Sequence, residues 1–480
     1  MLVGLGSAND SAPVVDLMTA AARRAGADTG VPAFLSSVDR IVVPHGSWKL
    51  TDPARTVARR LSASGARTVL CEIGVSQQEA INDALDAVAR GECEVALVVG
   101  GEARAWARTH DPEPDEDSRP PDLVRTRPPD FVAPIERAAG IVLPPVQQYA
   151  LIENALAAAE GLDMGEQRRD VAALWARFNA RAQTNPHAAF RAPLGEDAIA
   201  TPGPANRPLA FPYNKWHASQ WTVDQAAALV ICSSGRADAA GVPLDRRLYA
   251  HVALHCSAAV TLAARRDLHA WPAMHVLGRT AERHIDRPLR ELALAEVYSC
   301  FPSAVRVQQR ALGLDPAGTP TLTGGMAFGG GPFNHFVLTS TVELGQRLRE
   351  VASGRETELG MVTTVSGMLS KPGLALWGAA PPADGRMFLA DLAEEGLAAT
   401  EVLPVAEVPP AGPTPATVAA FTVTYGGDGG LEPVRTAVVA DLPDGVRTAA
   451  TCEDASTAGL AVTEGLAGRT VYVKDTTFSL

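Results

Sequence analysis

The chain has 480 residues, enough for two or three domains with sizeable cores. Hydrophobic residues make up 46% and charged residues 20%, as in ordinary globular proteins, and no stretch has the roughly 20 apolar residues that span a bilayer. The net charge of −12 argues against sequence-independent binding of nucleic acid, because that role requires an excess of Lys and Arg. We expect neither a nucleic acid nor a membrane as partner.

The first 110 residues alternate helical and strand-like patterns, which is typical of a layered α/β domain. Ser76 and Glu79 have the spacing of a capping box, so we expect a helix to begin there and to end at Gly91. Residues 94–100 predict a strand that is apolar from Val95 onward, as in a strand that is covered on both faces of a sheet. The other predicted elements are helices over 16–27 and 53–64 and strands over 38–44 and 68–73.

Residues 111–219 interrupt this pattern with a loop rich in Pro and Asp that leads into helical sequence, and we expect this insertion to form a lid. The loop and the two helical patterns cover 111–140, 149–160 and 165–182. Strand-like sequence returns at 226–232. Residues 220–245 are therefore predicted to join 1–110 in the first α/β half.

Residues 246–385 repeat the order of strand, polar strand end, helix and glycine-rich loop, which predicts a duplicated α/β unit. The predicted elements are strands near Ala250 and Leu292, helices over 303–312 and 339–353, and a strand over 359–365.

Residues 386–415 are rich in Pro and predict an extended linker. Beyond it, 416–480 contains short strands with Gly and Asp turns, as in a small β-barrel or sandwich. These strands are expected over 417–425, 433–441 and 469–474. Eight acidic against four basic residues in 416–480 disfavour oligonucleotide binding, so covering another domain or contacting a protein is the better interpretation.

The six cysteines form no CxxC pair and no metal-ligand spacing, and most lie in apolar stretches. Buried free thiols of this kind fit a reducing compartment. The first seven residues lack the basic start of a signal peptide. We therefore expect a soluble, cytoplasmic protein without a metal site.

The most informative segment is 323–335, which has five glycines between Gly324 and Gly331. Glycine permits positive φ and a close approach to a ligand or to another strand. Just upstream, 295–301 is a short apolar run that ends in polar groups around Tyr298. These two segments resemble active-site loops of the thiolase superfamily.

Further stretches of that superfamily resemble residues 100–103 and 221–228. The resemblance covers about 1–385, and the remainder looks like the added domain of type 1 thiolase-like proteins, which are related to sterol-carrier-protein thiolases. It implies a duplicated α/β/α/β/α thiolase fold with a helical lid, a small antiparallel OB-like barrel, and a coenzyme A thioester as ligand. It also implies a homodimer, the usual state in the superfamily. Because of the added domain, two alternatives remain: a monomer, or a complex with a different protein that binds at the barrel.

The catalytic side chains of the superfamily do not carry over to this sequence. Gly74 stands at the position of the nucleophilic Cys, and Cys71, three residues earlier, is interpreted as a core thiol. Gly331 takes the place of the His in the Gly-His-Pro triplet, and Val365 or Ser366 that of the second Cys. Gly74 and Gly331 together would enlarge the cavity into which two side chains normally project.

Two polar side chains remain as candidate catalytic groups. In the resemblance, Tyr298 takes the position of an Asn or His in another active-site loop of the superfamily. Its phenol can donate a hydrogen bond to a thioester oxygen, or act as acid and base if its pKa is lowered. The alternative is a Tyr at the end of a strand whose role is packing. His335 lies four residues after Gly331, the alternative being a helix-start or surface His. Candidate substrate-binding residues are Gly74, Gly324, Gly325, Gly330, Gly331, Ser366 and Gly367.

Three functions follow from this resemblance. The first is a retro-aldol or acyl-transfer reaction on acyl-CoA: thiolase-like aldolases have a Tyr at the position of Tyr298 and work beside an OB-fold protein, but carry a second Tyr where Gly331 stands. The second is a non-catalytic acyl-CoA binder or scaffold. The third is a genuine acetyl-CoA acyltransferase (thiolase), which three vacant catalytic positions disfavour.

Overall fold

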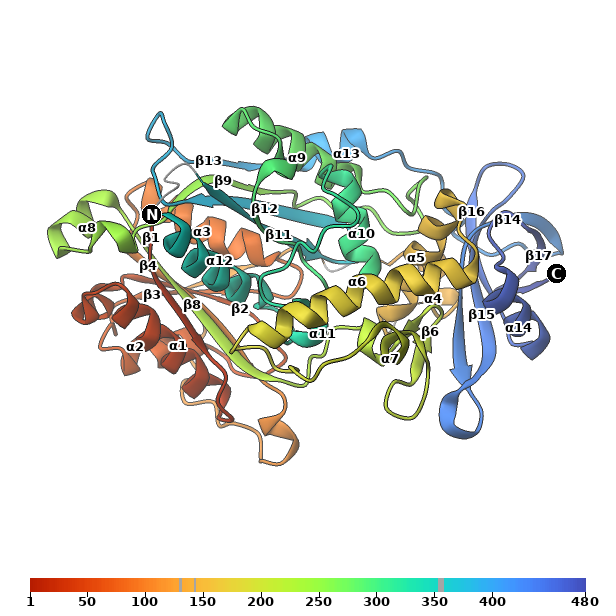
Figure 1. Ribbon diagram of the computed structural model, residues 1–480, viewed down its shortest axis with the longest axis horizontal. Helices are drawn as coiled ribbons and strands as arrows, with labels where there is room; N and C mark the ends of the chain where they lie inside the picture. The colour runs from red at the N-terminus through yellow and green to blue at the C-terminus, as the bar shows by residue number, and fades with distance from the viewer. Residues whose placement is uncertain (129–131, 142–143, 353–357) are drawn as a thin grey trace.

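Two open sheets and one closed barrel organise the chain, with the barrel at the far right of Figure 1. The computed structural model describes residues 1–128, 132–141, 144–352 and 358–480. In this part of the chain no helix is both long and apolar enough to cross a bilayer.

The first sheet has six strands in the order β1-β8-β4-β2-β3-β5. Its strands are β1 (Leu2–Ala8), β2 (Arg40–Pro44), β3 (Arg67–Cys71), β4 (Val95–Ala103), β5 (Leu123–Arg125) and β8 (Asp224–Cys232). Strands β2, β3 and β4 run parallel, and β8 is antiparallel to β4 and β1. Every residue of β4 is buried, as its continuous apolar sequence predicts.

The second sheet repeats this plan in the order β10-β11-β12-β9-β13. Its strands are β9 (Tyr249–His255), β10 (Leu294–Glu296), β11 (Leu359–Ser366), β12 (Lys371–Gly378) and β13 (Phe388–Asp391). Strand β10 pairs in parallel with β11, and β12 is antiparallel to its two neighbours, β11 and β9. The predicted duplication of an α/β unit is confirmed.

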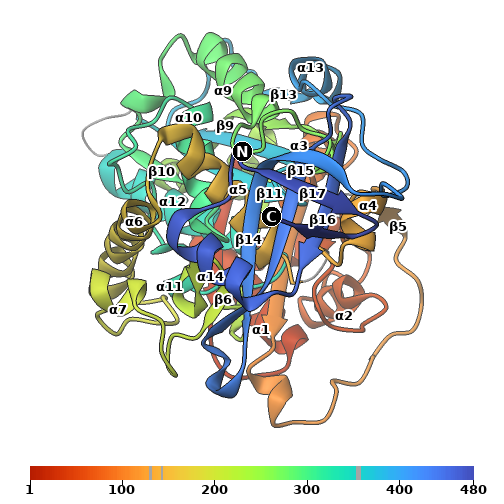
Figure 2. The same ribbon diagram turned by 90° about the vertical axis from the view of Figure 1, so that its right-hand side faces the viewer.

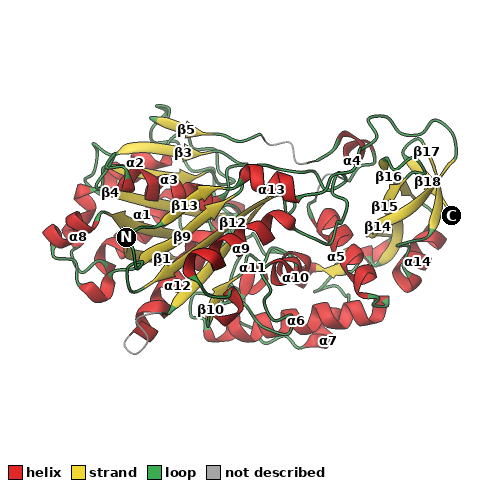
Figure 3. Cartoon of the chain, turned by 90° about the horizontal axis from the view of Figure 1, so that it is seen from above, coloured by secondary structure: helices red, strands yellow, loops and turns green. Residues whose placement is uncertain are grey.

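Helices form the remaining layers (Figure 3). The central helices α3 (Gln77–Ala89) and α12 (Phe336–Ala352) pack between the sheets, since α3 contacts β2 and β4 on one side and β9 and β12 on the other. Ser353, the predicted last residue of α12, lies outside the described residues. The other helices of the two halves are α1 (Val14–Asp28), α2 (Pro53–Arg60), α8 (Ser234–Ala240), α9 (Pro272–Ile285), α10 (Pro302–Ala311), α11 (Gly325–Phe328) and α13 (Ala393–Ala399).

The predicted linker is shorter than 386–415. Strand β13 pairs in parallel with β9, and α13 packs against α9, so residues 388–399 belong to the second half. The sequence prediction missed them because Pro and Gly on both sides read as a continuous linker.

The insertion is mainly helical, with α4 (Pro134–Ala138), α5 (Val146–Glu160), α6 (Met164–Thr184) and α7 (Glu196–Ala200). It also supplies strands that the sequence did not predict. Strand β5 extends the first sheet at β3, and β6 (Pro208–Ala210) and β7 (Tyr213–Asn214) extend the sheet of the barrel.

Five strands close the C-terminal barrel in the order β14-β15-β16-β18-β17 and back to β14 (Figure 2). They are β14 (Thr414–Gly426), β15 (Glu432–Asp441), β16 (Arg447–Cys452), β17 (Thr470–Lys474) and β18 (Thr477–Ser479), with α14 (Ala455–Glu464) between β16 and β17. The Asn154 side-chain amide of α5 donates to the carbonyl oxygens of Phe211 (3.0 Å) and Phe421 (2.7 Å). The barrel is therefore joined to the insertion by backbone pairing and by a buried amide.

Candidate functional site

Two of the predicted segments, those that contain Tyr298 and Ser366, meet the turn at the start of α3. The turn before this helix contains Gly74, with φ of +112°, and Ser76, whose hydroxyl accepts from the Glu79 amide at 3.2 Å. Gly74 is half-buried and the preceding Ile73 is 48% exposed. The position at which the sequence resemblance places the nucleophile is thus a turn close to the surface.

A side chain at Gly74 would meet its neighbours less closely than one in the glycine-rich loop. A Cβ built there would lie 3.3 Å from the Arg127 carbonyl oxygen and 3.9 Å from Lys371 Nζ. Lys371 begins β12 and donates a hydrogen bond to the Gly74 carbonyl oxygen. A buried amine, only 1% exposed at the level of the residue, therefore lies beside the vacated nucleophile position.

Tyr298 approaches the same turn from the end of β10. A hydrogen bond joins its phenol to Gln77, and its ring meets Phe336 edge-on at 5.7 Å. Burial raises the pKa of Tyr298 far above its ordinary value, the nearby Cys300 raises it further, and the hydrogen bond with Gln77 lowers it. The phenol is therefore protonated, which corrects the idea of a Tyr with a lowered pKa and leaves it as a hydrogen-bond donor.

A second tyrosine, which the sequence did not single out, reaches this region from α5. The Tyr149 hydroxyl donates to the Gly367 carbonyl oxygen at 3.2 Å, and its ring stacks on Phe301 at 4.5 Å. Burial raises the pKa of Cys300 to about 12, and a hydrogen bond with Tyr149 lowers it. Cys300 is thus a protonated core thiol, as is Cys71 in β3, where burial also raises the thiol pKa.

The glycine-rich loop is packed against protein on every side that a side chain would occupy. A Cβ at Gly331 would lie 1.9 Å from Ser219 Oγ, and one at Gly330 would lie 2.3 Å from Gln225 Oε1. At Gly324 and Gly325 the space is taken by Ala182 and Phe178. The expected enlargement of the cavity at Gly331 is therefore wrong, because neighbouring side chains have filled it.

Glu296 binds the residues that lead into this loop. Its carboxylate accepts from the backbone amides of Leu322 (2.6 Å) and Thr323 (2.8 Å) and from the Thr321 hydroxyl (2.9 Å). Burial raises the pKa of Glu296 to about 7, while these hydrogen bonds lower it. The glycines serve close packing around a fixed backbone.

His335 lies directly before α12 and is 1% exposed. Its Cβ would be 2.6 Å from a Cβ built on Gly100 of β4. Burial lowers the pKa of His335 to about 3, so the imidazole is neutral at physiological pH. The structure gives it the packing of a buried helix-start residue.

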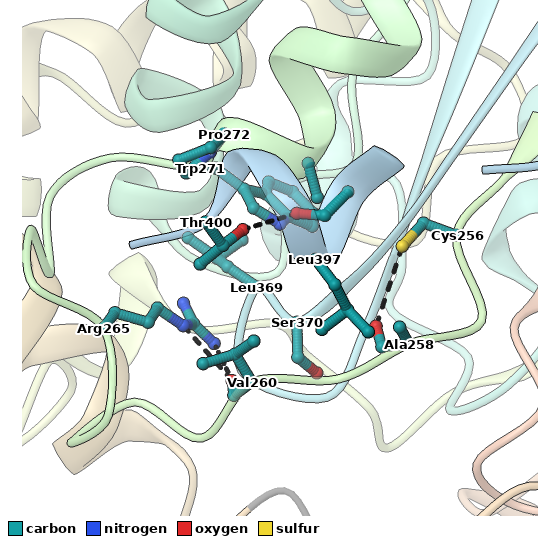
Figure 4. A pocket seen from close by; sticks show the side chains of 12 residues that line it. Cys256, Ala258, Val260, Arg265, Trp271, Pro272, Leu369, Ser370, Leu397 and Thr400 are labelled. Atoms are coloured by element: carbon teal, nitrogen blue, oxygen red, sulfur yellow. Dashed lines mark hydrogen bonds between the residues drawn. The ribbon is translucent and has the colours of Figure 1, made fainter. Parts of the chain in front are cut away.

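Ser366 and Gly367 lie at the turn between β11 and β12 and are half-buried, whereas Val365 is buried. Ser366 is the strand partner of Lys371, which places this turn beside Gly74. On the other side of the turn is a pocket of about 10 Å³, bounded by Leu369, Ser370 and the buried Arg265 (Figure 4). That volume admits one water molecule and no acyl group.

A larger cleft of about 450 Å³ opens between α3, β5 and β9, within the size range of small-molecule sites. Its lining includes Val75 and Glu79 at the start of α3, Arg127 after β5, and His255 at the end of β9. The Arg127 guanidinium donates to the Glu79 carboxylate at 2.7 Å, and the Asn82 amide lies 3.0 Å from His255 Nδ1. Among the described residues no cluster of His, Cys, Asp and Glu could hold a metal ion.

Sequence reasoning did not identify Lys371, Tyr149 or the cleft residues. A lysine at a strand start ordinarily reads as a solvated residue, and only its contact with Gly74, almost 300 residues away, reveals its burial. The one available signal was composition, since the chain has four lysines, at positions 49, 215, 371 and 474.

No protein-family model and no curated protein matches the sequence. Among solved structures, the chain is similar to a monomeric SCP2-thiolase-like protein type 1 from Mycobacterium smegmatis, at 25% identity and a TM-score of 0.82, over 99% of this chain and 97% of that one. It is also similar to an Ltp2–ChsH2 (DUF35) aldolase, at 18% identity and a TM-score of 0.59, over 79% and 97% of the two chains.

Human mitochondrial 3-ketoacyl-CoA thiolase, solved in complex with CoA, matches at 17% identity and a TM-score of 0.56, over 79% of this chain and 98% of that one. The last two likenesses show the fold alone, whereas the first extends over the barrel as well as the duplicated unit. The chain belongs to the thiolase superfamily and is similar over its whole length to SCP2-thiolase-like protein type 1.

Proposed function

We propose that this protein binds an acyl-CoA thioester and acts on a carbon–carbon bond beside the thioester without a covalent acyl–cysteine intermediate. The observation that carries this proposal is the Tyr298 phenol, which is hydrogen-bonded to Gln77 at the turn where the nucleophile of the superfamily would stand. The solved thiolase that contains CoA supports the ligand class.

The role of Tyr298 follows from its protonation. A neutral phenol in a buried site can donate to a thioester oxygen and stabilise negative charge that develops there as the bond breaks or forms. Such a donor suits retro-aldol or acyl-transfer chemistry.

Acyl-CoA binding without turnover is the second candidate. The close packing around the glycine-rich loop and the neutral, buried His335 favour this candidate, because neither supplies a general acid or base. Ordinary thiolase activity is disfavoured, since Gly74, Gly331 and Val365 or Ser366 stand at the usual catalytic positions.

The barrel's strand order, with α14 between its third and fourth strands, supports an OB-like assignment. Its contacts with the insertion suit the covering of a neighbouring domain, and a heteromeric partner would have to use its outer face. We retain the cytoplasm as the expected location and a monomer as the expected state, the latter by likeness to the monomeric mycobacterial protein.

The test combines calorimetry and turnover with a panel of 3-hydroxyacyl-, 3-ketoacyl- and saturated acyl-CoA esters. We expect one class to bind and to be cleaved, and Tyr298→Phe to lower kcat by about 10²-fold with little change in KM, as for the loss of one oxyanion donor. Tyr472→Phe is the matched control, because Tyr472 is an exposed barrel residue. Binding without turnover of any ester would establish the second candidate instead, and full activity of Tyr298→Phe would exclude the role given to this side chain.

A further inference from the structure

Lys371 has an environment unlike that of a surface lysine. Lys49 and Lys474 are exposed, and Lys215 is half-buried with its ammonium 4.8 Å from the centre of the Trp216 ring. Lys371 is 1% exposed and ranks among the largest fully buried side chains. Its amine is therefore removed from water.

Lys371 also lacks a carboxylate partner within the described residues. Its hydrogen bond goes to the neutral carbonyl oxygen of Gly74, and the nearby Glu79 carboxylate is bound by Arg127. Burial lowers the pKa of Lys371, the charge of Glu79 raises it, and Arg127 lowers it. A larger share of this amine is thus unprotonated and nucleophilic than of an exposed lysine.

A ligand can approach the amine from the side of Gly74. Gly74 contributes no side chain and is half-buried. The 450 Å³ cleft begins at its neighbours, Val75 in the sequence and Arg127 in space. A Cβ built at Gly74 lies 3.3 Å from the carbonyl oxygen of Arg127, which lines the cleft, and 3.9 Å from Lys371 Nζ, so the bare turn stands between the edge of the cleft and the amine.

We propose that Lys371 is a reactive amine that forms a Schiff base with a keto group of the ligand, at the place where the superfamily has its nucleophilic cysteine. The Nζ lone pair attacks the carbonyl carbon, and a proton passes from nitrogen to oxygen to give a carbinolamine. Loss of water then gives a neutral imine, which takes up one proton from solvent to become the protonated imine. Addition of water reverses these steps, returns the proton, and releases the product and the free amine.

The protonated imine withdraws electrons from the neighbouring carbon–carbon bond, which is what cleavage or formation of that bond requires. The inference rests on the proposed function only for the class of ligand, a thioester that also carries a keto group. It goes beyond that function by adding a covalent step at a residue other than Tyr298.

The test is reductive trapping of the full-length protein with acetoacetyl-CoA and sodium cyanoborohydride, followed by peptide mass mapping. Hydride reduction of the imine leaves a stable secondary amine with a defined mass. Because burial lowers the pKa of Lys371 and leaves more of its amine unprotonated, we expect labelling of Lys371 to exceed that of the exposed Lys49 and Lys474 at neutral pH. Labelling should depend on the reductant.

Lys371→Arg and Lys371→Met should lose the specific adduct, and Tyr298→Phe should keep it even if turnover falls, which separates this inference from the proposed function. The trapping rate of the wild-type protein between pH 6 and 9 provides a readout that needs no variant: Lys371 should reach half-maximal labelling at a lower pH than Lys49. Equal labelling of all four lysines, or an adduct that forms without reductant, would overturn the Schiff base.

Discussion

Gly331 and Gly74 both stand where the sequence resemblance places a catalytic side chain of thiolases, yet their surroundings differ. At Gly331 the empty space has been filled by Ser219, and the neighbouring glycines are packed against Ala182, Phe178 and Gln225. At Gly74 the closest atom to a built Cβ is the Arg127 carbonyl oxygen at 3.3 Å, and a buried amine lies at 3.9 Å.

The difference teaches that the loss of a catalytic residue can have two physical outcomes. A site that is closed by close packing contributes to stability, and restoring a side chain there would cost free energy of folding. A less crowded position beside a polar side chain can still admit a ligand that reacts with that side chain. Substitutions at both places can break or sharpen this contrast.

The largest effect is expected for Gly324→Ala in the packed loop. Its Cβ would lie 2.6 Å from Ala182 Cα and 2.7 Å from Ala182 N, which are backbone atoms that cannot rotate away, and φ at this residue is +92°. We expect a loss of about 3–5 kcal/mol in the free energy of unfolding, measured by chemical denaturation. Gly235→Ala is the control, because nothing lies within 4 Å of its built Cβ. Equal midpoints for the two variants would mean that the loop is not sealed.

Gly331→Ala should cost less, about 1–3 kcal/mol, because the closest atom is a hydroxyl that can rotate. Ser219→Gly removes that hydroxyl and its Cβ, so the double variant should recover part of the loss. A double-mutant cycle should give a coupling free energy of about 1 kcal/mol or more. Simple additivity of the two substitutions would contradict the assignment of Ser219 as the group that fills the site.

Gly74→Ala should have a smaller effect, since its cost comes mainly from backbone strain at φ of +112°. Its closest contact, 3.3 Å to the Arg127 carbonyl oxygen, is less severe than the overlaps at Gly324. We expect a loss of about 1–2 kcal/mol in thermal or chemical unfolding. The added methyl group should also slow cyanoborohydride trapping at Lys371. If Gly74→Ala destabilised the protein as strongly as Gly324→Ala, the contrast between an open and a sealed site would be lost.

The smallest effect concerns the pH dependence of stability at Lys371. Because burial lowers the folded-state pKa below the unfolded value near 10.4, the unfolded chain binds more protons between these two values. Wild-type stability should therefore rise through this window relative to Lys371→Met, which has no titrating group. Urea unfolding at pH 7 and pH 10 checks the sign, and a difference that stays constant or shrinks contradicts it.

The fold could be predicted from the sequence where patterning is strong and local. The apolar run 94–100 forms the buried strand β4, and the Ser76 cap begins α3 one residue later. Strand β12 was missed because Pro372 and Gly373 near its start read as a turn, although both are buried in the sheet. Its antiparallel partners β11 and β9 stabilise it, and the strand propensity of its own residues gives no information about these pairings.

The candidate site was predictable only in part, for a related reason. The sequence shows which positions lack a catalytic side chain, but the residues that surround those positions come from distant segments. Ser219 lies more than 100 residues before Gly331, and Lys371 lies almost 300 residues after Gly74. The sequence therefore identified the positions without their surroundings.

Strand β5 has a consequence for self-association. An exposed sheet edge is a template on which a second copy of a chain can add a strand, and β3 would be such an edge. Here the insertion lays Leu123–Arg125 against it, and the new outermost strand is three residues long, with Arg125 bound to Asp83. A second copy would have to displace β5 to extend this sheet, so the insertion also protects the protein against edge-to-edge aggregation.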